Sequence, residues 1–388
     1  RCGRPGSGLR SCPVSGDGNA LTVSDLAQVL AGCAELLVGP RSRAVVLLLI
    51  DGLGARQLRD FATAAPTLAA MQPFASVVQD RQVGGRTVFP STTATALASL
   101  GTGLDPGEHG LVGTAFWVPE IDQALFPLKW GTEPNPVMIQ PEPTVFEAMV
   151  RAGVDVVSVG PQAYRASGLT QAALRGGRYL VAESAQERLD VIAEALRVVT
   201  STFIYCYWPR LDRVGHEQGV GSPEWLAALT EVDGIAAGIL SCLGPDQHLV
   251  VTADHGMVNC PPDRRILIEG RPMLVNGVAR VLGDPRARHL YVHTGRGTAA
   301  GLAADVAARW RDELTGVATV ATRMEAVEQG WFGRVDPLLA DRIGDVVAVC
   351  DQDWMLSSRT DPTVSRLVGQ HGGMTPDEMQ IPILHARG

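Results

Sequence analysis

Acidic and imidazole side chains recur in this chain at spacings that suit metal ligands, beginning with the segment TADHGM. The apolar run LVVTA leads directly into Asp254 and His255, so a predicted buried strand ends by presenting a carboxylate beside an imidazole. The segment LDRVGHEQG supplies Asp212 and, four positions later, His216. Both pairs offer the nitrogen and oxygen donors that divalent transition metals bind.

Two further segments each add one candidate ligand. IDGLG places Asp51 directly before glycines, and GQHGGM places His371 between glycines, which let a backbone bend closely around a ligand. The chain thus offers three carboxylates and three imidazoles. Two zinc ions need roughly three protein ligands each, plus open positions for a substrate. The set predicts a two-metal site in which cations roughly 4 Å apart clamp a phosphoryl group.

A nucleophile is predicted in the segment TVFPSTTATALASLGTGLDPGEHG, a Ser- and Thr-rich turn that runs into a helix. A hydroxyl at a helix N-terminus has its anion stabilised by the helix dipole and by free N–H groups. A neighbouring cation activates it further. On composition alone Ser91, Thr92 and Thr93 all meet these conditions. The alternative for Thr93 is a simple capping hydroxyl.

The elements predicted around these residues alternate between strands and helices. Apolar runs predict strands at 44–50, 155–160, 202–208 and 248–254, and helical spacing predicts helices at 26–37, 184–199 and 222–241. Ser24 or Asp25 can cap the first helix. The alternation predicts an α/β fold with a doubly wound, mostly parallel central sheet and helices on both faces. Ligands of such sheets bind at the carboxyl ends of strands, where the three candidate carboxylates lie.

Three regions fit this pattern less well. Residues 1–20 are rich in Gly, Pro and Ser and are predicted to form a loose tail, with 21–388 as one catalytic domain. Residues 115–145 are rich in Pro and aromatic residues and are predicted to form a cap loop over the site. Residues 260–345 combine short strands such as 290–294 with a helix near 299–314, which predicts a small inserted subdomain.

Composition excludes several classes of protein. Of the 388 residues 46% are hydrophobic and 19% charged, which argues against disorder. The net charge of −8, without a basic patch, argues against a duplex nucleic acid partner. The strongest apolar run, 44–50, is far shorter than the roughly 20 residues of a membrane span, so no span is predicted. Scattered cysteines without a CxxC motif indicate free thiols, and a cytoplasmic location is expected. Oligomeric state stays open.

Five segments, in a fixed order, carry a resemblance to a known family. They are LLLIDGLG, FPSTTATALASLGTGLDPGEHGLVG, DRVGHEQG, TADHGM and QHGGMTPDEMQIPIL, and they cover about residues 44–385. In this order they resemble the type I phosphodiesterase/nucleotide pyrophosphatase group of the alkaline phosphatase superfamily. Each motif alone is short, so the resemblance rests on their order and on all six ligand positions being filled. It implies an alkaline phosphatase-like fold and a metal-dependent hydrolase of phosphodiester or pyrophosphate bonds.

The resemblance also implies a role for each ligand candidate. One zinc ion would be held by Asp212, His216 and His371. The other would be held by Asp51, Asp254 and His255, together with the oxygen of Thr93. The implied cofactors are therefore two divalent metal ions, with Zn²⁺ as the first expectation, although nitrogen and oxygen sites also accept manganese or iron. The implied substrate is a small-molecule phosphodiester or nucleotide.

The position of the nucleophile follows from the same motif. Counting back from the Thr-Gly that precedes Leu-Asp-Pro-Gly-Glu-His-Gly, the family's nucleophile falls on Thr93, and Thr92 is the alternative. The resemblance implies a covalent phosphothreonine intermediate. Family members hold a phosphate oxygen with an Asn further along, where this chain has Thr114. Thr114 is therefore the expected substrate-binding residue, and its difference from Asn bears on substrate choice.

Other activities of the superfamily are weighed against the same residues. Phosphomonoesterases commonly follow the nucleophile with Arg to grip a dianion, whereas Ala94 follows here. A sulfatase requires a Cys-x-Pro-x-Arg type motif, which the sequence lacks. A phosphonate hydrolase shares the metal ligands and stays open. A non-catalytic metal-binding homologue should have lost a ligand or the nucleophile, and every one of these positions is filled.

Overall fold

The computed structural model describes residues 26–38, 42–74, 85–198, 200–293 and 299–388. The predicted tail at 1–20 and the predicted helix caps Ser24 and Asp25 lie outside these residues.

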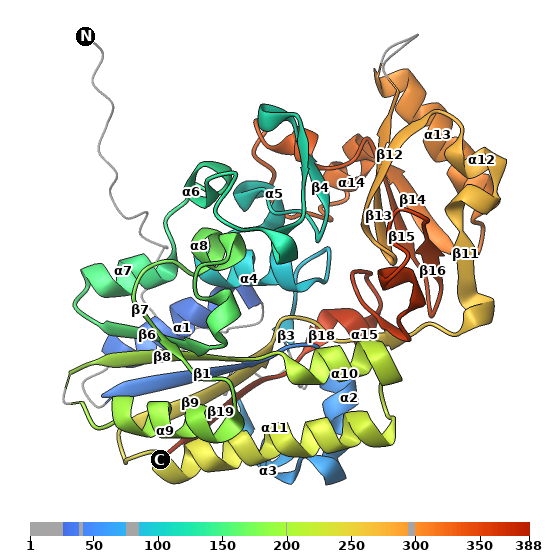
Figure 1. Cartoon of the computed structure of the whole chain (residues 1–388). Coiled ribbons are helices and arrows are strands. Elements are labelled where there is room, and N and C mark those ends of the chain that lie inside the picture. Colours follow the sequence, from blue (N-terminus) through green and yellow to red (C-terminus); the bar gives the residue numbers. More distant parts are fainter. Residues whose placement is uncertain (1–25, 39–41, 75–84, 199, 294–298) are drawn as a thin grey trace, which may run out of the picture.

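A seven-stranded mixed sheet, mostly parallel, forms the centre of the molecule (Figure 1). Its strands in spatial order are β2 (Gln72–Pro73), β19 (Ile383–Arg387), β9 (Gln247–Ala253), β1 (Ala44–Ile50), β8 (Thr202–Trp208), β6 (Asp155–Gly160) and β7 (Arg178–Val181). The five strands from β9 to β7 are parallel, and β19 is antiparallel to β9. Every residue of β1 is buried, as expected for a parallel strand covered on both faces. The predicted fold class is confirmed.

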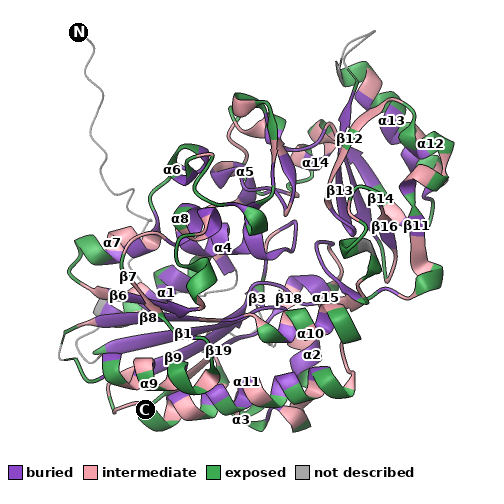
Figure 2. Cartoon of the chain, viewed as in Figure 1, coloured by how far each residue is buried: buried purple, intermediate pink, exposed green. Residues whose placement is uncertain are grey.

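Helices cover both faces of this sheet (Figure 1). On one face lie α1 (Leu26–Val38), α4 (Thr93–Thr102), α7 (Val145–Arg151) and α8 (Gly168–Ala173); on the other lie α3 (Pro66–Ala70), α9 (Ala185–Ala195) and α11 (Pro223–Cys242). Figure 2 shows the central strands β1, β8 and β9 buried between these two layers. The helix predicted at 184–199 ends at Ala195, because the amides of Arg197 and Val198 bond to carbonyls three residues back and turn the chain toward β8.

Helix α11 is long and apolar enough to cross a membrane by length and composition. In the fold it lies against α9, α3 and α10 (Arg210–Gln218), and its apolar side is buried through residues such as Trp225, Val232 and Ile239. A core helix of this kind passes the same length and composition test as a membrane span.

A second, smaller sheet is inserted between β9 and β19. Its antiparallel strands in order are β12 (Val278–Asp284), β13 (Ala287–Val292), β15 (Val346–Cys350) and β14 (Ala318–Thr322), and α13 (Ala299–Glu313) packs against it over a separate hydrophobic core. The predicted insert ends at 345, but the sheet continues through β15. That strand pairs with both β13 and β14, so the inserted sheet extends to residue 350. Beyond it β16 (Met355–Ser357) pairs with β11 (Arg265–Leu267).

The segment predicted as a cap loop, 115–145, contains a short hairpin of β4 (Phe116–Val118) and β5 (Gln123–Leu125). The hairpin contacts the second sheet directly. The amide of Trp117 donates to the hydroxyl of Tyr291 at 2.9 Å, and the guanidinium of Arg342 lies 3.0 Å from the Glu120 carboxylate. Segment 115–145 therefore connects the second sheet to α8, one of the helices that cover the central sheet.

A fully buried ion pair makes a second connection between the two sheets. Arg286 donates to both carboxylate oxygens of Glu378, from Nε at 2.6 Å and from Nη2 at 2.9 Å. Glu378 also accepts from the amide of Gly373 at 2.8 Å and from the hydroxyl of Thr375 at 2.7 Å. Arg286 lies between β12 and β13, so the pair ties the second sheet to the segment that follows His371.

Candidate active site

The order of the strands brings the three candidate carboxylates together. Strand β1 lies between β8 and β9 in register, so the residues that follow these three strands meet at one edge of the sheet. Asp51 follows β1, Asp254 follows β9, and Asp212 lies in the first turn of α10, directly after β8. This is the carboxyl edge at which α/β sheets bind their ligands.

Gly52 allows this close approach. Its φ of 77° lies in the left-handed region, and a Cβ there would stand 2.9 Å from the Cα of Asp212. Its amide donates to Asp254 Oδ1 at 3.1 Å, which orients that carboxylate. The glycine of IDGLG is therefore required both by backbone geometry and by the space between the carboxylates.

One group of candidate ligands gathers around His255. Its Nε2 atom lies 3.5 Å from Asp51 Oδ1, 3.5 Å from Asp254 Oδ2 and 3.2 Å from Thr93 Oγ1. Asp51, Asp254 and His255 offer ligand atoms that all lie within 4.8 Å of one another, and all three are buried.

The second group surrounds Asp212. Its carboxylate lies 3.4 Å from His216 Nε2 and 3.9 Å from His371 Nε2. Around Asp212, the ligand atoms of Asp212, His255 and His371 all lie within 4.8 Å of one another. The rings of His255 and His371 stack with centroids 3.7 Å apart, so the two groups are contiguous. All six residues predicted as ligands are therefore brought together, with His255 between the groups and His216 at the outer edge.

The three imidazoles share one orientation. Nδ1 of His216 lies 2.7 Å from the carbonyl oxygen of Gly369, Nδ1 of His255 lies 3.0 Å from that of Gly256, and Nδ1 of His371 lies 3.0 Å from that of Ser91. A carbonyl oxygen only accepts, so each ring carries its proton on Nδ1. Each Nε2 atom then carries a lone pair that faces the carboxylates. Metal-binding histidines are commonly held in this way, with the other ring nitrogen donating to a backbone carbonyl.

The carboxylates have matching unpaired oxygens. Asp51 Oδ1, Asp212 Oδ1 and Asp254 Oδ2 are buried without a hydrogen-bond partner among the described residues. Burial, and then the charges of Asp254 and Asp212, raise the pKa of Asp51 well above its ordinary value. Three clustered acids beside three Nε2 lone pairs form an oxygen and nitrogen donor set that fits divalent cations, whose charge would offset the repulsion between the acids.

The three candidate nucleophiles have different surroundings. Thr93 is the first residue of α4 and faces His255. The hydroxyl of Thr92, the N-cap residue, is buried without a partner among the described residues and does not cap the helix. Ser91 donates to the carbonyl of Gly373 at 2.7 Å and accepts from Gly372, so its hydroxyl holds the loop that carries His371.

Thr114 lies beside a carboxyl group rather than in the ligand cluster. Its hydroxyl donates to Asp284 Oδ1 at 2.6 Å. Asp284 is 6% exposed, and its other oxygen has no partner among the described residues. Burial raises the pKa of Asp284. A Cβ on Gly372 would come 2.9 Å from the Cβ of Asp284, so this acid stands next to the His371 loop.

Two functional candidates were not predicted from the sequence. Asp284 ends β12, a strand that was not predicted from the sequence, and its approach to the site depends on the insertion of the second sheet. Tyr207 donates its hydroxyl to Asp51 Oδ2. Tyr207 is the penultimate residue of a predicted strand. A tyrosine hydroxyl at the carboxyl end of a strand was the sequence feature that could have indicated it.

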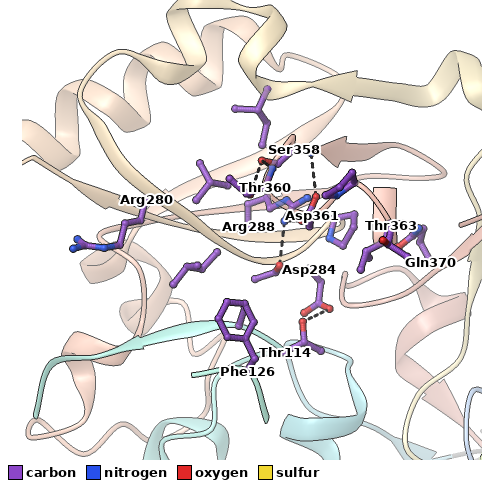
Figure 3. Close-up of a pocket in the computed structure, with 18 of the residues that line it drawn as sticks. Thr114, Phe126, Arg280, Asp284, Arg288, Ser358, Thr360, Asp361, Thr363 and Gln370 are labelled. Atoms are coloured by element: carbon purple, nitrogen blue, oxygen red, sulfur yellow. Dashed lines mark hydrogen bonds and ion pairs between the residues drawn. The ribbon is translucent and has the colours of Figure 1, made fainter. Parts of the chain in front are cut away.

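Two cavities flank the ligand cluster. The first, here called the nucleophile-side chamber, has about 460 Å³ and is lined by residues that include Asp51, Thr93, Tyr164 and Tyr207. The second, here called the second-sheet chamber, has about 640 Å³ (Figure 3). Its lining includes Thr114, Asp284, His216 and His371 together with most of β12. Both volumes fall within the range of small-molecule sites.

Comparison with known proteins gives a family match. The family model described as "Type I phosphodiesterase / nucleotide pyrophosphatase" matches residues 45–374. Among curated proteins, ectonucleotide pyrophosphatase/phosphodiesterase family member 1 of Rattus norvegicus is 26% identical over 262 residues, 63% of this chain and 27% of that protein. Phosphopentomutase of Anaeromyxobacter dehalogenans (strain 2CP-C) is 32% identical over 161 residues, 41% of this chain and 39% of that protein. The chain thus spans well under half the length of these relatives.

Solved structures show the same fold. Murine ectonucleotide pyrophosphatase/phosphodiesterase 5 superposes with a TM-score of 0.68 at 20% identity, covering 88% of this chain and 87% of that chain. A second structure of that murine protein, an inactive variant with a threonine replaced by alanine and in complex with AMP, gives a TM-score of 0.67 at 20% identity, with the same coverage.

Proposed function

Because this chain belongs to the type I phosphodiesterase/nucleotide pyrophosphatase family, we propose that it is a metal-dependent hydrolase of phosphodiester or pyrophosphate bonds. We propose further that Thr93 is the nucleophile and that the reaction passes through a phosphothreonine. The substrate is a small phosphodiester or a nucleotide.

One observation carries the proposal. Three Nε2 lone pairs and three unpaired carboxylate oxygens converge within a few ångströms of a threonine hydroxyl at the start of a helix. A structural cluster would pair these groups with protein donors, because buried carboxylate oxygens without partners are costly. Imidazole nitrogens and carboxylate oxygens that all face one centre are the ligand atoms expected of a site for cations and an anionic substrate.

We assign the ligands as two sets: Asp212, His216 and His371 for one divalent cation, and Asp51, Asp254 and His255 for the other. When bound, the two cations supply Lewis acidity to the phosphoryl oxygens and stabilise charge on the attacking and leaving oxygens. Zn²⁺ is the cation we propose, since imidazole and carboxylate donors suit it.

The chain's own residues account for the remaining steps. The Thr93 hydroxyl loses its proton as Oγ1 forms a bond to phosphorus, and the ester oxygen on the opposite side leaves with its electron pair and takes up a proton. Water then attacks the phosphothreonine, breaks the bond between phosphorus and Oγ1, and returns the threonine hydroxyl. Helix α4 begins at Thr93, so the free amides of its first turn would stabilise negative charge beside this residue. Tyr207 orients Asp51 throughout by its hydrogen bond.

A related protein supports the choice of residue and substrate class. The solved murine relative in complex with AMP is described as inactive after a threonine-to-alanine change. A threonine of this chain in an equivalent role must face the candidate ligand residues. The hydroxyl of Thr93 lies 3.2 Å from His255 Nε2, whereas that of Thr92 has no hydrogen-bond partner among the described residues. The two-chamber arrangement also supports a diester, which carries a group on each side of phosphorus.

The test is hydrolysis of bis-p-nitrophenyl phosphate and p-nitrophenyl phosphate by the zinc-loaded protein, with Thr93→Ala beside it. We expect faster turnover of the diester and a loss of at least about a thousandfold in kcat for Thr93→Ala, because nucleophilic catalysis is removed. Thr92→Ala is the matched control and should retain activity. Loss in Thr92→Ala alone would move the nucleophile to Thr92, and preference for the monoester would identify a phosphatase instead.

A further inference from the structure

The second-sheet chamber is apolar at its mouth as well as in its walls. Phe126, Leu128, Val275 and Val364 line it and are 46%, 57%, 41% and 38% exposed. Large apolar side chains gathered around a cavity and left open to water are typical of a binding site rather than of ordinary surface. They come from the cap, from α12 (Pro272–Val275) and from the segment after β16, so three separate parts of the chain contribute to the same apolar ring.

The two arginines of the lining are engaged with neighbouring groups, and the third cation, Lys129, is exposed. Arg288 is 1% exposed and donates to Asp361 at 2.6 Å and to the carbonyl of Leu356 at 2.6 Å. The guanidinium of Arg280 lies 3.9 Å from the centroid of the Trp117 ring, and Figure 3 shows its side chain extending away from the other labelled residues. Lys129 is exposed on the short 3-10 turn at 127–129. At the inner end the lining presents the carboxyl group of Asp284, an acceptor already bonded to Thr114, which offers no cation to an anionic occupant.

The position of the chamber defines which part of a substrate enters it. It is bordered by the two histidines of the Asp212 ligand set, His216 and His371, whereas Thr93 borders the nucleophile-side chamber, which Asp212 itself also lines. In an in-line displacement the leaving oxygen departs on the side opposite the nucleophile. The group attached to that oxygen therefore extends toward the second sheet.

From these contacts, and resting on the proposed diesterase activity, we infer that the second-sheet chamber binds the leaving arm of the substrate and that this arm is uncharged and largely apolar. The preferred substrates are phosphodiesters with an aryl or alkyl leaving group. Nucleoside triphosphates, whose leaving group is the polyanion pyrophosphate, are poor substrates by comparison.

The experiment varies the leaving arm while keeping the other arm constant. Four thymidine 5′-phosphate derivatives release the same product, thymidine 5′-monophosphate: the phenyl ester, the 4-butylphenyl ester, the p-nitrophenyl ester and the triphosphate. Phenol and 4-butylphenol differ little in basicity as leaving groups. The ratio of kcat/KM for their two esters therefore reports contact with the butyl group. A fully buried methylene contributes about fourfold, so we expect kcat/KM of the butylphenyl ester to exceed that of the phenyl ester by at least about tenfold. We expect the p-nitrophenyl ester to exceed the triphosphate by a similar factor.

Variants place the effect in the chamber. Val275→Glu with Val364→Glu adds two carboxylates to the exposed rim, which should bring the butylphenyl-to-phenyl ratio below about threefold. The matched control is Val150→Glu with Val198→Glu, at residues 43% and 44% exposed that line neither chamber, and it should keep the ratio. All the esters carry the same charge, so added repulsion cancels in the ratio.

The outcomes separate the two proposals. No product from any of the four compounds would overturn the proposed function itself. Product from all four, with equal rates for the phenyl and butylphenyl esters or with the triphosphate preferred, would retain the hydrolase and overturn the assignment of the chamber. An unchanged ratio in the rim variant would also overturn it.

Discussion

Replacing Glu378 by Gln tests whether the buried ion pair between the two sheets maintains the fold around the loop that carries His371. The change keeps the size of the side chain and removes its charge. Both partners are 0% exposed, and the carboxylate accepts from Arg286 twice, from Gly373 and from Thr375. The amide of Gln can accept at only one of its two terminal atoms, so its NH₂ group would face donors.

The expected loss of stability follows from the state in which Arg286 is left. Breaking a buried pair by removing one charge costs about 3–5 kcal/mol, because the remaining charge is buried without compensation. Typical domains have only about 5–15 kcal/mol of unfolding free energy, so this loss is a large fraction of the total. We expect Glu378→Gln to lower the unfolding free energy by about 3–5 kcal/mol.

Urea denaturation of the zinc-loaded protein, followed by circular dichroism, measures this change. Asp246→Asn is the control. Asp246 forms an ion pair with Arg387 at 3.0 Å, but the two side chains are 41% and 49% exposed. Exposed pairs of this kind contribute only about 0–1 kcal/mol to stability. Arg286→Met and the double variant complete a cycle in which the two single losses should not add. A loss below about 1 kcal/mol for Glu378→Gln, or full additivity, would refute the reasoning.

Three further outcomes are expected. Removal of divalent cations by a chelator should abolish diester hydrolysis and lower the melting temperature, since a ligand at 100 times its Kd stabilises the native state by about 2.7 kcal/mol; return of zinc should restore both, and an unchanged melting curve would contradict a buried cation site. Tyr207→Phe removes the hydrogen bond to Asp51 and should weaken zinc affinity about 10- to 100-fold by competition with a chelating dye, whereas Tyr205→Phe, whose hydroxyl has no partner among the described residues, should leave it unchanged. Burial lowers the pKa of His109 and of His289 to about 3, so below about pH 6.5 the unfolded chain binds protons that the native state does not. Unfolding free energy should therefore fall from about pH 6.5 toward pH 3, by up to about 1.4 kcal/mol per pH unit for each histidine, and a flat urea-denaturation profile from pH 7 to 4 would contradict this.

The sequence predicted the central sheet well because its strands have strong local signals. β1 is a continuous apolar run, and the strands predicted at 155–160 and 202–208 have the bounds observed. The ends of α9 were harder to predict, because they depend on where the chain must turn to enter β8. The second sheet was outlined only in part: β15 has the apolar run of a central strand, but its partners are distant in sequence, so local patterning did not join it to β13.

The convergence of the candidate carboxylates was predictable because Asp51, Asp212 and Asp254 each come after a strand of the parallel part of the central sheet. His371 follows a short strand outside that sheet, so its approach was not predictable in this way. The surroundings of Thr114 were not predictable in this way. Its partner Asp284 comes from another sheet 170 residues away, and only the three-dimensional approach of β12 to the His371 loop brings them together. The tautomers of the three histidines likewise depend on backbone carbonyls that a linear pattern does not locate.

The insertion of the second sheet between β9 and β19 has a consequence for biosynthesis. Strand β19 occupies a place inside the sheet, between β2 and β9, and His371 precedes it closely. During translation the set Asp51, Asp254 and His255 is complete before the second sheet exists, whereas the Asp212 set waits for His371. A nascent chain halted after β16 would therefore present half of the candidate cation ligands and an open edge on β9. An unpaired strand edge favours pairing with other chains until the last strand takes its place.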